Sequence, residues 1–212
     1  MRVLEGWSEK ISVPVKRVAL EGVAAQPGAS AFQLASLLEQ FHRVTNDANK
    51  LVLGRAAGDL TSRLHSGSWS ATECLDHLTR TTLSFLPAIS RAIATAPELA
   101  TNRSLRTGTI ALLLIRNLEP PYRLRYKVIP ELVPQKTGFE AAWSNFEKSQ
   151  SQLSEAVQAA VGLAIDRVNV RCPVYARISY NVYGAFRMLA AHQRRHLWQM
   201  QQILTALDRK RS

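Results

Sequence analysis

The chain of 212 residues has few cysteines and no long apolar run. Cys74 and Cys172 are far apart and form no CxxC pair, which favours reduced thiols over a disulfide framework. The longest apolar run, Ile110 to Ile115, is far shorter than the roughly 20 residues of a transmembrane helix. Glu5 and Glu9 interrupt the N-terminus before an apolar segment of a secretory signal could form. These absences predict a cytoplasmic protein without a membrane span.

Acidic residues are also scarce, with 16 Asp and Glu against 27 Lys and Arg, a formal net charge of +11. The excess lies in the second half, where bases exceed acids by four over residues 101–140 and by six over residues 141–212. Aromatic residues make up only 7% of the chain, and only Tyr122 to Lys127 alternates aromatic and basic residues as a nucleic-acid-binding segment does. The same alternation is ordinary for a half-buried extended segment, so we do not expect a nucleic-acid partner.

Two helical regions are predicted in the first half. From Ala31 to Leu64 the apolar residues recur at intervals of three and four, broken near Asn46 to Asn49, which indicates one long helix or two stacked pieces. Ser70 and Glu73 have the spacing of a capping box at the start of a second helix. This helix should run to about Thr95, and Pro87 is expected to kink it or to end its first part.

The second half predicts two further long helices, at about 139–161 and 180–208, after an irregular stretch from 100 to 138 that contains one short apolar helix near 106–117. No segment demands a sheet. The predicted fold class is therefore all-α, a four-helix bundle with a long crossover between the second and third helices. We expect an N-terminal extension over residues 1–30 and the bundle domain over residues 31–210.

The last helix carries the clearest candidate for chemistry. His192 and His196 are four residues apart, so they stand one turn from each other on one face of the helix. They continue an apolar stripe that includes Leu189 and Met200, so both imidazoles should point into the bundle. Buried imidazoles need partners, and a shared metal ion would satisfy both. Bonding of each to water or backbone is the alternative.

His77, one turn after Glu73 on the second helix, is a third candidate ligand. If the bundle brings the second and last helices together, His77 would complete a set of three histidines. Three neutral nitrogen ligands leave a coordination position open for water or substrate, as in a reactive metal centre.

The segments around these three histidines resemble motifs of the DinB-like family (DinB/YfiT-like metalloenzymes). Gly67 to Leu78 resembles the family's "WS..E...HL" opening of its second helix, and His192 to Gln199 resembles its "H..RHL.Q" signature in the last helix. The resemblance covers roughly Ala31 to Leu207. It implies a four-helix bundle in which His77, His192 and His196 bind a divalent metal ion, zinc or nickel.

The same resemblance leaves the function open between several hypotheses. The family includes transferases that use low-molecular-weight thiols, so a thiol-dependent S-transferase or a hydrolase is expected, with a small electrophilic substrate and homodimer formation. A metal- or ligand-binding stress-response module without turnover is the alternative. No independent catalytic nucleophile or acid is recognisable in the sequence.

Several residues near the three histidines in the sequence also have an expected role or position. Glu73 is a candidate for orienting the His77 imidazole, with helix capping as the alternative. Gln199 is a candidate for a hydrogen bond to a metal-bound water, with packing in the core or at the surface as the alternative. Asp76 is expected at the surface, Cys74 in the core, and Trp69 over the start of the second helix. Five arginines are available to hold a carboxylate of a cosubstrate, namely Arg123, Arg125, Arg187, Arg194 and Arg195.

Overall fold

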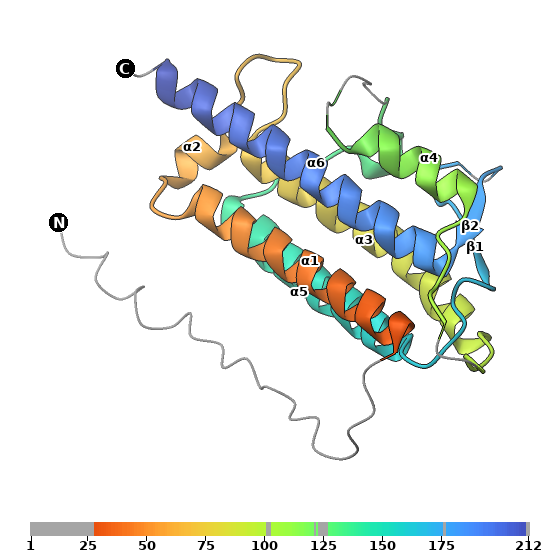
Figure 1. Cartoon of the computed structure of the whole chain (residues 1–212). Coiled ribbons are helices and arrows are strands. Elements are labelled where there is room, and N and C mark those ends of the chain that lie inside the picture. The colour runs from red at the N-terminus through yellow and green to blue at the C-terminus, as the bar shows by residue number, and fades with distance from the viewer. Residues whose placement is uncertain (1–27, 101–102, 121, 123–126, 176, 211–212) are drawn as a thin grey trace.

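The computed structural model describes residues 28–100, 103–120, 122, 127–175 and 177–210. Four long helices dominate it (Figure 1): α1 (Ala29–Val52), α3 (Ala71–Ala94), α5 (Phe139–Ala159) and α6 (Val182–Arg209). The shorter elements are α2 (Ala57–Thr61), α4 (Thr109–Leu118), a 3-10 turn η1 (Pro130–Leu132), β1 (Asn169–Arg171) and β2 (Ser179–Asn181). Residues 1–27 lie outside the described part, so the N-terminal extension and the domain division stay predictions.

The long helices pack so that α1 and α3 each contact both α5 and α6. In Figure 1, α4 lies along the outer side of α6, at the end of the molecule where β1 and β2 also lie. The mostly helical architecture agrees with the all-α class predicted from the sequence. Within the described residues, no helix is both long enough and apolar enough to cross a membrane.

Local sequence accounts for the starts of α3 and α6. At α3 the Ser70 hydroxyl accepts from the Glu73 amide and the Glu73 carboxylate accepts from the Ser70 amide, so the predicted capping box is confirmed. Asn181 caps α6 by accepting from the Gly184 amide. Pro87 lies inside α3 and does not end the helix, which continues to Ala94.

The first helical region is divided at a different place from the one predicted. Helix α1 continues through Asn46–Asn49 and ends at Val52, and the chain turns at Gly54, whose φ is 74°. Glycine adopts this left-handed conformation without steric cost, which explains why the chain turns here. Asn46, Asp47 and Asn49 do not break the helix, because they lie on its exposed side. The short helix α2 then forms a separate piece.

A small antiparallel sheet is the feature that the sequence pattern did not predict. Strands β1 and β2 pair Val170 with Tyr180, and both of these side chains are buried. Each strand has only three residues, too few for the alternation of apolar and polar residues that identifies a strand in a sequence. Each strand therefore forms only because it pairs with the other strand of the hairpin.

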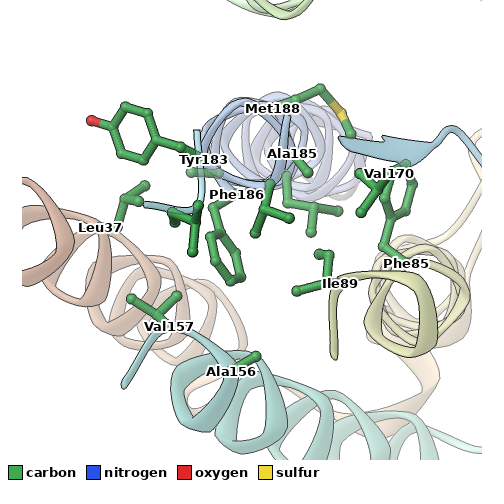
Figure 2. Close-up of a cluster of buried hydrophobic side chains, with 14 of the residues drawn as sticks. Leu37, Phe85, Ile89, Ala156, Val157, Val170, Tyr183, Ala185, Phe186 and Met188 are labelled. Carbon is green, nitrogen blue, oxygen red and sulfur yellow. The ribbon is translucent and has the colours of Figure 1, made fainter. Parts of the chain in front are cut away.

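The apolar core is split into two clusters along the helices. One cluster fills the end of the molecule nearest the sheet, where Figure 2 shows Phe186 of α6 projecting between Leu37, Val157 and Ile89 of the other three long helices. The other fills the end nearest α2 and includes Leu75, Phe146, Met200 and other residues. Between them lies a layer of buried polar side chains: His77, Thr79, Thr81, Thr82, Ser149, Gln150, Gln193 and His196. Burial of a polar group without a partner is costly, and Thr81, Gln150 and Gln193 of this layer have buried side-chain atoms without a partner among the described residues.

Candidate metal centre

The three predicted histidines come together in this polar layer. His77 lies on α3, and His192 and His196 lie one turn apart on α6, which packs against α3. Their ring centroids are 4.5–5.2 Å apart. His77 is 3% exposed and His196 8% exposed, whereas His192 is partly exposed. One potential ligand atom from each residue lies within 4.8 Å of the others, so the group could hold a metal ion.

Two of the imidazoles have their outer nitrogen held by a hydrogen-bond acceptor. His77 Nδ1 donates to the Leu132 carbonyl at 2.8 Å, and His196 Nδ1 donates to Gln199 Oε1 at 2.9 Å. With the proton on Nδ1, the Nε2 atom of each ring carries the lone pair that a metal requires. Both rings therefore present the correct tautomer for coordination.

The spacing of the nitrogen atoms also suits a metal. His77 Nε2 and His192 Nε2 are 3.3 Å apart. Two nitrogens bound to a tetrahedral zinc at 2.0–2.1 Å stand roughly 3.3–3.4 Å apart. His192 Nδ1 is buried and has no hydrogen-bond partner among the described residues. Three convergent nitrogens with no carboxylate among them match the donor set of a borderline metal such as zinc or nickel.

Burial keeps the three imidazoles uncharged. Burial first, and the charges of His77 and Arg195 second, lower the pKa of His192 to about 3. Burial and the neighbouring imidazoles hold the pKa of His196 well below its usual value, and burial also lowers the pKa of His77. All three side chains are thus neutral near pH 7, the protonation state in which histidine binds a metal.

The segment that supplies the Leu132 carbonyl is tied to α3 by Asp76. The Asp76 carboxylate accepts from Arg80 at 2.7 Å and from the Gln135 amide at 2.8 Å. The prediction that Asp76 lies at the surface is therefore wrong, because this residue is buried by the chain that follows η1. That chain is remote in sequence, and helical periodicity gives no signal of it.

Glu73 and Gln199 differ in their relation to the histidines. Gln199 contacts His196 directly, as described above. The Glu73 carboxylate is engaged by the Ser70 amide and by Arg63, and among the described residues no hydrogen bond joins it to an imidazole. A role for either residue toward a metal stays a prediction. Cys74 is fully buried in the core, and burial raises the pKa of its thiol, so it is no ready ligand.

Trp69 contributes more to the site than sequence reasoning assigned to it. Its ring lies 4.8 Å from the His77 ring and stacks on the His196 ring at 5.8 Å. The residue stands just before α3, so it covers the helix start and two imidazoles at once. Its place in the "WS" motif was the signal, but the motif alone does not say what the ring touches.

A cavity of about 650 Å³ adjoins the three histidines, and we call it the histidine cavity. Residues of α3, α4, α6, the 127–132 segment and the 172–180 hairpin line it. Of the five candidate arginines only Arg195 lines it in the described part of the chain, and its guanidinium lies 5.4 Å from the Tyr122 ring centroid. Arg187 binds Thr107 and Arg194 binds Glu119 and Gln40, whereas Arg123 and Arg125 lie outside the described residues.

Comparison with known proteins agrees with this arrangement. The family model of the DinB superfamily matches residues 40–200, a range that contains all three histidines. The chain belongs to the DinB superfamily. No curated protein and no solved structure matches it. Membership therefore supports the motif-based resemblance, and the side-chain geometry carries the rest of the functional argument.

Proposed function

We propose that this DinB protein binds one divalent metal ion through the Nε2 atoms of His77, His192 and His196. The observation that carries the proposal is the convergence of three neutral imidazoles, those of His77 and His196 buried and that of His192 partly exposed, two of which have their Nδ1 proton already bound by an acceptor. We further propose that α1, α3, α5 and α6 form the four-helix bundle of the family, with the 95–138 segment as its crossover. Zinc and nickel are the metals that this donor set favours.

The residues around the ligands would prepare the site for reaction. The Leu132 carbonyl and Gln199 orient two imidazoles, and Trp69 shields them from solvent. When bound, a divalent metal supplies a Lewis acid that lowers the pKa of a thiol or of water. The histidine cavity beside the ligands offers room for a second reactant.

We propose an enzyme, a thiol-dependent S-transferase or a hydrolase, as the function that this site supports best. No Asp or Glu is among the described residues that line the cavity, so a carboxylate general base is absent from that part of the wall. The nucleophile would then come from a low-molecular-weight thiol or from water. The same lack of a carboxylate favours the second candidate, a metal- or ligand-binding module without turnover.

Elemental analysis of the purified full-length protein tests the metal proposal. We expect about one equivalent of zinc or nickel in the wild type and large losses in His77→Ala and His192→Ala. His42→Ala is the matched control, because His42 lies exposed on α1 and should leave the metal content unchanged. Wild-type protein without stoichiometric metal, or equal metal in all three variants, would refute the proposal.

A thiol-consumption assay separates the enzyme from the module. The metal-loaded protein is incubated with a low-molecular-weight thiol and an epoxide or quinone electrophile, and loss of free thiol is followed over time. We expect consumption above the uncatalysed rate that disappears in His192→Ala and persists in His42→Ala. Stoichiometric metal without any rate enhancement would favour the non-catalytic module.

A further inference from the structure

The histidine cavity has two chemically different parts. The three histidines, Arg195 and Gln199 give its wall around the ligands a polar character. The part next to the sheet is bounded mainly by apolar side chains from four separate segments of the chain: Phe85 of α3, Leu114 and Leu118 of α4, Val174 and Ile178 of the hairpin, and Met188 of α6. Thr81, Tyr175 and Tyr180 add uncharged hydroxyl groups to the lining. The elements that make this apolar wall include α4 and the hairpin, which are additions to the four long helices.

The apolar part extends along α3 and α6 in a definite direction. His77, Thr81 and Phe85 line the cavity at successive turns of α3, a distance of about 12 Å along the helix. On α6, Met188 precedes His192 by one turn. The cavity therefore leads from the histidines toward the hairpin. Its volume falls within the range of roughly 300–1,000 Å³ usual for small-molecule sites.

We infer that the histidine cavity binds a largely apolar small molecule, with its apolar body against Phe85, Leu114 and Met188 and its polar end toward the histidines. Lys127 and Arg195 are the Lys and Arg residues of the described lining, and none of the side chains named in the apolar wall can compensate a charge on that body. A charged group there would lose its hydration without a partner. The inference rests on the proposed function, in which this molecule is the substrate of the metal centre.

Titration of the full-length, metal-loaded protein with N-phenyl-1-naphthylamine tests the inference. This probe is uncharged and apolar, and its fluorescence rises on transfer from water to an apolar site. We expect saturable binding of one probe per chain. Leu114→Trp, which fills part of the cavity, should weaken binding at least about tenfold.

Leu113→Trp is the matched control, because Leu113 directly precedes Leu114 in α4, is 63% exposed and does not line the cavity. Its affinity should stay within about twofold of the wild type. Ile178→Trp provides a second test from the hairpin side, in case Leu114→Trp fails to fold by circular dichroism. Absence of saturable binding, or equal affinity in the wall variants and the control, would overturn the inference.

Elemental analysis of the same samples separates this inference from the proposed function. Metal-loaded protein that does not bind the probe would refute the apolar substrate and leave the metal proposal standing. Probe binding to a wild type that holds no metal would refute the metal centre and leave the apolar character of the cavity supported.

Discussion

The close contact between α4 and α6 provides a sharp test of how the wall of the histidine cavity is built. Gly184 lies in the first turn of α6, under α4. A Cβ atom at this position would stand 2.6 Å from the Thr107 carbonyl oxygen, 2.7 Å from Ala111 Cβ and 3.0 Å from Asn181 Oδ1. The first of these is a backbone atom, so relief requires movement of the chain that leads into α4. We predict that Gly184→Ala destabilises the protein and loosens α4.

Two opposing effects set the magnitude. Alanine is favoured over glycine inside a helix by about 1 kcal/mol. Overpacking of a rigid site costs typically about 1–3 kcal/mol, and contacts below 3 Å with backbone and a buried methyl place Gly184 at the upper end. The net loss is therefore about 1–2 kcal/mol, which lowers Tm by roughly 2–8 °C in a domain of this size.

Thermal unfolding followed by circular dichroism measures this loss. Gly58→Ala is the matched control, since Gly58 also lies in a helix but has no atom within 4 Å of the added Cβ. Its Tm should stay level or rise slightly because helix propensity improves. A Tm of Gly184→Ala equal to or above that of Gly58→Ala would show that α4 does not approach α6 as described.

Four further substitutions test two threonines of the polar layer, the ion-paired Asp166 carboxylate and the support of a candidate ligand. Thr81→Val should raise the free energy of unfolding by about 1 kcal/mol, because the buried Thr81 hydroxyl has no partner among the described residues. Thr82→Val should lower the free energy of unfolding, because the side-chain amide of Gln193 loses its acceptor. Equal effects of the two substitutions in urea titrations would contradict this. Burial would raise the pKa of Asp166, but hydrogen bonds from an arginine and a backbone amide hold this pKa below its usual value. The carboxylate thus stabilises the protein at neutral pH, and the stability difference between wild type and Asp166→Asn should shrink as the pH falls below about 4, whereas a constant difference would refute the assignment. Gln199→Leu should weaken metal binding about 10–100-fold in competition with a chromophoric chelator, because His196 loses its acceptor, and unchanged affinity would show that this bond does not tune the ligand.

The features that could be predicted from the sequence are those set by residues close together in the chain. The capping box at Ser70 and Glu73 needs only a spacing of three, and the apolar periods of three and four identified all four long helices. The pair His192 and His196 was found in the same way. The role of His77 depended on resemblance to a family, because no local pattern links it to α6.

Three of the misses arise from contacts between segments that no local pattern connects. Asp76 was expected at the surface, but the chain around Gln135 covers it. The strands β1 and β2 were not predicted, because each is stabilised by pairing with the other and neither shows an alternation of apolar and polar residues. The motif that contains Trp69 was recognised in the sequence, but its ring contacts with His77 and His196 depend on the packing of α3 against α6.

The sequence by itself determined the helical class, the helix starts and the membership of three histidines in two recognisable motifs. These follow from local hydrogen bonding and from the side on which each residue of a helix lies. Only the tertiary structure decided that the three imidazoles converge, which acceptors hold their Nδ1 protons, and that an apolar cavity adjoins them. Those properties arise from side chains up to about 120 residues apart, whose meeting depends on how the helices pack and on nothing that a short stretch of sequence encodes.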